Sequence, residues 1–339
     1  IFVVGNSRSG TTLMGNILGN NADVFTFEEL HFFDQVWSSQ TQQEGLSKAD
    51  SIQVVARLFS IQASDFLTPE DPNLFIEDAT KIVSDLNADT IKPATLFASF
   101  LQAKAQTSGK STPCEQTPQN VLYIKELLAL YPNCRIINMV RDPRDILLSQ
   151  KYKWRIKFLG ASNIPYREVF RAWANYHPIV IAKLWTASVQ AAKEFESHPR
   201  VKTVRFEDFI TDSNNVLKEV CRFSNITFDT EAISQMLNVS QQEGGVSSHK
   251  KLDSAARGID TGVISKWKKG GLTPSEIHIC QNIARSEMDA YEYEATDISP
   301  LQKLSSMRLV VSLPFKLSLA LLLNLGRAKN IAEAIKKRL

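Results

Sequence analysis

The start of the chain runs from an apolar segment directly into a glycine-rich loop. Residues 1–4 are apolar, residues 5–12 read GNSRSGTT, and the apolar residues that follow recur at helical spacing. A strand, a glycine turn and a helix N-terminus together present free backbone N–H groups and a positive helix dipole to an anion. This order predicts a phosphate-binding loop at the edge of a parallel α/β sheet.

The loop differs from the common nucleoside-triphosphate loop in its charged residue. In the pattern GxxxxGK[ST] a lysine follows the second glycine and reaches the terminal phosphates. Here Thr11 takes that place, and Arg8 supplies a positive charge from within the loop. Two alternatives stay open at this point: a nucleotide-dependent kinase on a related loop fold, and a turn that holds no ligand.

A second segment of the same kind follows residues 134–140, CRIINMV, which predict a buried strand. Asp142 is a favourable N-cap and Pro143 a favourable first residue of a helix. Arg141 therefore stands between the strand and the helix, at the carboxyl edge where open α/β sheets bind ligands.

On a helix that begins at Pro143, Asp145, Ser149 and Lys153 share one face at a spacing of four residues. Arginine forms forked contacts with phosphate, and a serine hydroxyl adds a neutral donor. The segment predicts a second anion site, although Arg141 could instead pair with a carboxylate of the protein.

The rest of the chain alternates predicted strands and helices. A third strand is expected at 201–204 and a long helix at 166–196, whereas 105–120 is rich in Ser, Thr, Gln and Pro and is expected to be a loop. The pattern predicts an α/β fold, a P-loop-like three-layer sandwich whose central parallel sheet has helices on both faces. We expect one domain over 1–300 and a C-terminal helical tail over 301–339.

The two motifs together resemble the sulfotransferases that use 3′-phosphoadenosine 5′-phosphosulfate (PAPS). The matching segments are SRSGTTLM at 7–14 and RDPRDILLS at 141–149, and the similarity continues through 202–208 and 264–268. The resemblance implies in-line transfer of a sulfuryl group from PAPS to a hydroxyl or amine, with release of 3′-phosphoadenosine 5′-phosphate (PAP). It assigns the 5′-phosphosulfate to the first loop and the 3′-phosphate to the second motif, and no triphosphate chain then requires a lysine.

The resemblance is closest to the tyrosylprotein and bacterial branches of the family, where a Glu-Glu pair follows the loop. Here the pair is Glu28-Glu29. Glu29 matches the catalytic base, with Glu28 as the alternative, and Arg8 matches the residue that steadies the transferring group. The cofactor-binding residues that the resemblance implies are Arg8, Ser9, Gly10, Thr11, Thr12, Arg141, Ser149, Lys153, Ser248 and Lys266.

The chain departs from the family pattern at several positions. Ser7 stands where proline usually precedes the loop arginine, and the chain has Gln116-Thr117-Pro118 where the family often has Lys-Thr-Pro. The histidine base of the cytosolic branch has no clear match, so His31 and His249 remain candidates for that role. A non-catalytic protein that keeps the cofactor pocket is a further alternative, and Trp267 is a candidate for stacking on adenine or for lining the acceptor pocket.

Composition limits the partners. The net charge of +3 is too small to indicate nucleic acid, and the four cysteines are widely spaced, which favours free thiols over disulfides or a metal site. The expected acceptor is a small molecule, lipid, glycan or peptide hydroxyl, and no metal is required.

The segment 306–325 is apolar but contains Pro314 and Lys316, so its uninterrupted run is too short to span a membrane. It predicts a packing helix or an interfacial helix with peripheral membrane contact. The chain begins without Met inside a strand, which suggests a fragment. We expect a cytoplasmic protein, or a membrane-anchored protein of the Golgi lumen if a preceding segment carries an anchor.

Overall fold

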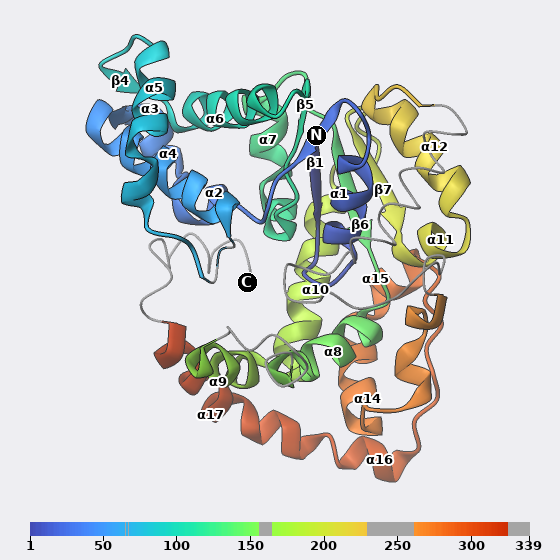
Figure 1. The fold of residues 1–339 in the computed structure, drawn as a ribbon. Helices are drawn as coiled ribbons and strands as arrows, with labels where there is room; N and C mark the ends of the chain where they lie inside the picture. Colours follow the sequence, from blue (N-terminus) through green and yellow to red (C-terminus); the bar gives the residue numbers. More distant parts are fainter. Residues whose placement is uncertain (65, 67, 156–164, 229–260, 325–339) are drawn as a thin grey trace.

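A computed structural model of the protein describes all residues except 65, 67, 156–164, 229–260 and 325–339 (Figure 1). Short parallel strands lie at its centre, and helices surround them. The strands of the described chain are β1 (Phe2–Gly5), β2 (Val24–Thr26), β3 (Leu46–Ser47), β4 (Thr90–Ile91), β5 (Thr112–Cys114), β6 (Ile136–Val140) and β7 (Val201–Arg205).

The central sheet is parallel, as the sequence predicted. Strands β1, β6 and β7 pair in that order, and β2 pairs with β5. A parallel bridge between Phe2 and Glu115 joins the two groups, because the Val3 N–H donates to the Glu115 carbonyl at 2.8 Å and the Glu115 N–H donates to the Ile1 carbonyl at 3.0 Å. The resulting order is β2-β5-β1-β6-β7, with the glycine loop leaving the central strand.

Helices account for most of the remaining described chain. They are α1 (Thr11–Gly19), α2 (Phe32–Gln35), α3 (Ser39–Glu44), α4 (Lys48–Ala63), α5 (Ile76–Asp85), α6 (Pro93–Thr107), α7 (Ile124–Leu130), α8 (Pro143–Lys151), α9 (Tyr166–Asn175), α10 (Pro178–Lys193), α11 (Phe206–Thr211), α12 (Ser213–Ser224), α14 (Pro274–Ile283), α15 (Arg285–Ala290), α16 (Pro300–Leu304) and α17 (Met307–Asn324). Short 3₁₀ turns are η1 (Pro72–Phe75), η2 (Pro118–Tyr123), η4 (Thr261–Val263) and η5 (Lys266–Lys269).

The two faces of the sheet are covered by different helices. Side chains alternate along a strand, so Val3 joins a cluster with α1, α11 and α12, whereas Val4 joins a cluster with α2, α4, α5, α6 and α7. Figure 1 shows these groups on opposite sides of the strands. The three-layer arrangement expected from the sequence is therefore confirmed.

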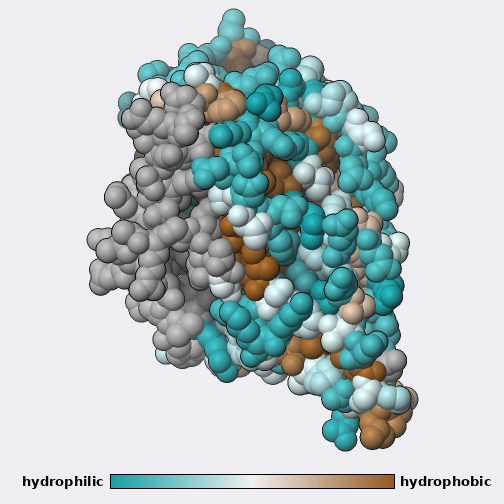
Figure 2. Space-filling view, turned by 90° about the vertical axis from the view of Figure 1, so that its right-hand side faces the viewer, coloured by the Kyte–Doolittle hydropathy of each residue, from teal (hydrophilic) through white to brown (hydrophobic). Residues whose placement is uncertain are grey.

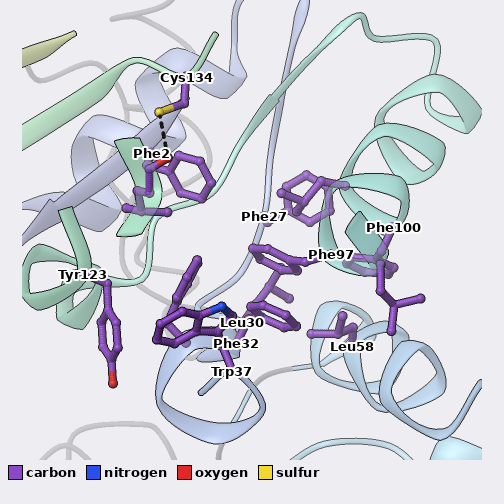
Figure 3. Close-up of a cluster of buried hydrophobic side chains, with 14 of the residues drawn as sticks. Phe2, Phe27, Leu30, Phe32, Trp37, Leu58, Phe97, Phe100, Tyr123 and Cys134 are labelled. Carbon is purple, nitrogen blue, oxygen red and sulfur yellow. Dashed lines mark hydrogen bonds between the residues drawn. The ribbon is translucent and has the colours of Figure 1, made fainter. Parts of the chain in front are cut away.

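An aromatic cluster beside the sheet anchors the segment that carries the two glutamates (Figure 3). The rings of Phe32 and Phe97 stack with centroids 4.1 Å apart, and Phe27 contacts Phe100 at 5.8 Å. Phe27 and Leu30 are both buried, so the backbone from residue 28 to 29 is fixed at both ends by core side chains.

Several elements differ from the sequence predictions. The expected loop at 105–120 contains β5, which its pairing with β1 and β2 stabilises despite Pro113. The expected long helix at 166–196 is broken before Pro178, where His177 caps α10. Helix α17, in contrast, continues through Pro314 and covers nearly the whole segment 306–325 for which a helix was predicted. The four cysteines are free and buried, as predicted.

Candidate active site

The glycine loop after β1 has the backbone that an anion site requires. Gly5, Arg8 and Gly10 have φ angles of 150°, 76° and 93°, and Gly10 is the N-cap of α1. A Cβ at Gly10 would lie 2.4 Å from a ring carbon of Phe206, so the loop packs too closely for any side chain there. Glycine at position 10 therefore meets both a conformational and a steric requirement.

One buried polar side chain of the loop has no hydrogen-bond partner within the described structure. Ser9 is fully buried and its Oγ has no partner among the described residues. Thr11 is buried at the first turn of α1, while Thr12 is partly exposed beside it. A buried hydroxyl without a partner costs about 1–3 kcal/mol. An oxygen-rich ligand in the loop would relieve that cost.

Arg8 connects the first loop to the second predicted motif. Its Nε donates to Ser149 Oγ at 2.9 Å, and its backbone carbonyl accepts from Arg141 Nη1 at 3.3 Å. The pKa of Arg8 is lowered, first because the loop strips part of its hydration and then because the Arg141 guanidinium lies near it, while Glu29 acts in the opposite direction. Two cations are thus held close together, which favours an anion between them.

Arg141 is held from several sides. Its Nη2 donates to the Val263 carbonyl at 2.8 Å, and its guanidinium lies over the Phe206 ring at 4.3 Å from the centroid. Burial lowers the pKa of Arg141, while Asp145 and Glu207 act in the opposite direction. Its Nε is buried without a hydrogen-bond partner among the described residues.

A buried network beneath Arg141 fixes the start of α8. Asp142 caps the helix by accepting from the Arg144 N–H at 2.8 Å, and its carboxylate also binds the Arg144 side chain in a forked pair, at 2.9 and 2.7 Å. Trp267 Nε1 donates to the same carboxylate at 3.2 Å, and the Arg144 guanidinium lies 4.0 Å over its ring. Because these groups are nearly fully buried, they hold the Arg141 backbone in place.

Glu29 lies near enough to Arg8 to act on it electrostatically, and it is tethered by a histidine. Its carboxylate is 3.5 Å from His31 Nε2, and His31 Nδ1 is 3.2 Å from Asp34. Burial alone would lower the pKa of His31, but hydrogen bonds to Asp34 and Glu29 outweigh it and raise the pKa to about 9. His31 is therefore an imidazolium at neutral pH that holds the partly exposed Glu29 carboxylate in one orientation.

Sequence reasoning missed the buried support for this segment. Glu115 accepts from the Thr117 N–H at 3.1 Å, from the Thr117 hydroxyl, and from Asn120 Nδ2 at 2.6 Å. Thr117 Oγ1 in turn accepts from the His31 N–H at 3.2 Å. Burial raises the pKa of Glu115 to about 7, although the hydrogen bonds from Thr117 oppose part of that rise. The only sequence signal was Gln116-Thr117-Pro118, noted as a departure from a family pattern.

The remaining predicted site residues do not all lie where the sequence indicated. Helix α8 ends at Lys151, so Lys153 lies beyond it and is exposed, and the predicted common helix face does not extend that far. Lys266 is exposed at the start of η5, and Ser248 and His249 lie outside the described residues. Trp267 is buried against Arg144, which contradicts the prediction that it stacks on adenine.

Two further acidic residues of the predicted motifs, Asp145 and Glu28, have hydrogen bonds within the protein. Asp145 Oδ1 accepts from the Trp267 N–H at 2.9 Å and is 4.0 Å from Arg141 through its other oxygen, so it supports the scaffold from within. The backbone N–H of Glu28 donates to Gln62 Oε1 at 3.0 Å. Within the described residues, no cluster of three or more His, Cys, Asp or Glu side chains could hold a metal ion.

Comparison with known families decides the identity of this arrangement. Residues 1–230 match the model of the family described as "Sulfotransferase family", which is more than half of the chain. The chain belongs to the sulfotransferase family. The match confirms the resemblance found in the sequence, and it includes the glycine loop, Glu29 and the whole of the second motif.

Solved structures show the same fold. The sulfotransferase is similar to the sulfotransferase domain from the curacin biosynthetic pathway, with 18% identity, a TM-score of 0.52, and coverage of 87% of this chain and 98% of that one. It is also similar to the sulfotransferase domain from the Synechococcus PCC 7002 olefin synthase, with 18% identity, a TM-score of 0.53, and coverage of 87% and 94%. No curated protein matches the chain in a comparison by sequence.

Proposed function

We propose that the protein transfers the sulfuryl group of PAPS to an acceptor hydroxyl, with Glu29 as the general base and PAP as the second product. The observation that carries the proposal is the convergence of the two motifs: Arg8 of the first loop bonds Ser149, and Arg141 bonds the Arg8 carbonyl. One ligand with two separated phosphates can therefore engage both motifs.

The residues present fit such a ligand. The 5′-phosphosulfate is assigned to the loop, where the buried hydroxyl of Ser9 and the threonines at the start of α1 are donors. The 3′-phosphate is assigned to Arg141 and Ser149, and the unpartnered Nε of Arg141 supports that assignment. Lys153 and Lys266, both exposed, are assigned to the same cofactor through the family pattern.

The reaction requires a base, a charge stabiliser and a good leaving group. When bound, PAPS supplies an activated sulfuryl group whose S–O bond to the 5′-phosphate breaks as a bond from sulfur to the acceptor oxygen forms. Glu29 takes the proton of the acceptor hydroxyl, and the ion pair of its carboxylate with His31, at 3.5 Å, supports this role. Arg8 and the loop N–H groups stabilise the charge that develops on the departing side, and donors of this kind are worth about 3–4 kcal/mol each in the barrier.

The acceptor class follows from the surroundings of Glu29. The Phe66 ring packs on the His31 ring with centroids 4.1 Å apart, and Phe25 lies partly buried nearby. A hydroxyl carried on an apolar or aromatic body fits these walls better than a highly charged polysaccharide.

Calorimetric titration with PAP, without added metal, tests the cofactor assignment. We expect micromolar or tighter binding that Arg141→Ala abolishes and that Arg285→Ala, an exposed arginine on α15, leaves unchanged. Binding of ATP with magnesium in place of PAP would overturn the assignment in favour of a kinase. Binding of PAP without transfer of labelled sulfuryl to any hydroxyl acceptor would instead favour the non-catalytic alternative.

A second experiment assigns the base. Glu29→Gln is expected to leave PAP binding intact and to lower turnover by roughly a hundredfold or more, in the range of lost general-base catalysis. Glu28→Gln is the matched control and is expected to change turnover little. If Glu28→Gln instead causes the larger loss, the roles of the two glutamates are reversed.

A further inference from the structure

The outward face of α17 is mostly apolar. Six of its side chains are each more than half exposed and recur at helical spacing: Met307, Val310, Val311, Phe315, Leu321 and Leu322. Helices α16 and α17 together are also long and apolar enough, by length and composition, to cross a membrane. A surface helix normally points such a stripe at the core. Here the stripe faces outward, along the lower edge of Figure 1.

Other groups of α17 contact the protein, although Arg308 and Ser318 are exposed. Lys316 Nζ donates to the Trp173 carbonyl at 3.3 Å and lies over its ring, and Asn324 Nδ2 donates to Asn175 Oδ1 at 2.8 Å. The Leu323 carbonyl accepts from Arg171 Nε at 3.0 Å. These contacts attach α17 to α9 along one side. Because a spanning helix would have to break them, they favour a helix that lies in the plane of a surface.

The apolar face continues onto α9. Tyr166, Phe170 and Trp173 on that helix are exposed by 66%, 63% and 43%, and α9 packs beside α17. Hydrophobic residues also gather at the lower corner of the space-filling view (Figure 2), in the region where Figure 1 places α16 and α17. Aromatic rings with a polar edge are typical of positions at the level of lipid headgroups.

The charge of this end of the chain differs from that of the rest. The segment 300–339 contains eight Lys or Arg and one Glu, whereas the whole chain has 39 Lys or Arg and 36 Asp or Glu. The remainder is therefore slightly acidic, and the basic excess is confined to the sequence around and after the apolar helix. Basic residues next to an apolar helical face favour anionic lipids. They disfavour a second copy of the same surface, because two such segments would repel each other.

We propose that the outward faces of α17 and α9 dock the enzyme on the surface of a membrane that contains anionic lipids, with α17 lying parallel to the bilayer. This inference does not depend on the proposed reaction. It gives the apolar face a partner of matching polarity and matching charge, and it leaves the hydrogen bonds between α17 and α9 intact.

Flotation of the full chain with lipid vesicles tests the inference. The probes are vesicles of phosphatidylcholine alone and vesicles of phosphatidylcholine mixed with phosphatidylglycerol. We expect binding to the mixed vesicles that added salt weakens. The double variant V311S/F315S is expected to weaken it by about tenfold or more, because two exposed apolar side chains lose their partner. The control L74S removes an equally exposed leucine from η1, far from α17 in the sequence, and is expected to bind as the parent does.

Two results would overturn the inference. One is a chain that does not float with either kind of vesicle, whatever its oligomeric state. The other is a dimer in light scattering that V311S/F315S converts to a monomer without any change in vesicle binding, which would assign the surface to a second copy. Circular dichroism and PAP titration of the double variant show whether the body of the enzyme is still folded.

Discussion

Arg8 and Ser149 lie 141 positions apart in the chain, yet the Nε of Arg8 donates to the Oγ of Ser149 at 2.9 Å. The loop after β1 and the helix after β6 leave neighbouring strands at the same edge of the sheet, which brings the two residues together. The contact joins the proposed site of group transfer to the proposed site of the 3′-phosphate. A substitution at the proposed 3′-phosphate site is therefore expected to change turnover at the proposed site of group transfer.

Ser149→Ala tests this coupling. The variant removes a donor for the 3′-phosphate and the acceptor that holds Arg8, so we expect PAP affinity to fall by about tenfold and turnover to fall with it. Ser213→Ala is the matched control, because its hydroxyl is also hydrogen-bonded, to the Phe209 carbonyl at 2.8 Å, but it lies in α12 and belongs to neither motif. Calorimetry and initial rates measure both effects. A loss of PAP affinity without a loss of turnover would show that the two sites are not coupled through Ser149.

Gly10→Ala tests the steric requirement of the loop. Its Cβ would lie 2.4 Å from the Phe206 ring that carries the Arg141 guanidinium, and its φ of 93° is strained for any L residue. We expect the variant to lose PAP binding and to unfold more easily. Gly109→Ala has a φ of 72° with open space around the added Cβ, so it should show only the conformational cost of about 1–2 kcal/mol. Equal effects of the two substitutions would contradict the role of Phe206.

The parts of the site that the sequence predicted are those with local causes. The glycine loop needs unusual φ angles, and the start of α8 needs a capping aspartate followed by proline, so both are visible in a few consecutive residues. The support of His31 by Glu115 and Thr117 is different. It depends on the pairing of β5 between β1 and β2, which no pattern within 105–120 indicates.

Two predictions were wrong, each for its own physical reason. Trp267 was predicted to contact the ligand, but its indole N–H and its ring are used by Asp142 and Arg144. A buried arginine and a nucleotide base can both pack on the face of an aromatic ring, and the sequence alone does not show which of them does so. Lys153 was placed on the helix face with Ser149, yet α8 ends before it, because helix length depends on packing as well as on spacing.

Arg144→Lys tests the buried network under the second motif. Arg144 makes a forked pair with Asp142 and also donates to Gln281 at 3.1 Å and to the Glu294 carbonyl at 2.7 Å. Lysine keeps the charge but has no planar fork, so we expect a loss of about 2–3 kcal/mol in the free energy of unfolding. Arg285→Lys makes the same change in an exposed pair with Asp289 and should cost less than about 0.5 kcal/mol. Chemical denaturation compares the two variants, and similar losses would show that the network contributes little.

The pH dependence of stability tests the charge of His31. Its pKa is raised from 6.5 to about 9 in the folded protein by Asp34 and Glu29. The folded state therefore holds the proton more tightly, and its stabilisation is complete below pH 6.5 and is lost as the pH rises through about 9. The contribution is at most about 3 kcal/mol. Glu115, whose pKa is raised from 4.5 to about 7, gives a similar loss in a lower window, between pH 4.5 and 7.

The two windows can be separated by substitution. His31→Gln should flatten the free energy of unfolding between pH 6.5 and 9 while leaving the lower window in place. Glu115→Gln should flatten the free energy of unfolding between pH 4.5 and 7 and leave the upper window in place, because glutamine does not titrate. The variant should stay folded, since the unpartnered Oδ1 of Asn120 can turn to accept from the new amide. The proposed tethering of Glu29 adds a kinetic readout, since His31→Gln should lower turnover with PAP affinity unchanged. An upper window that persists in His31→Gln would show that another group carries the proton.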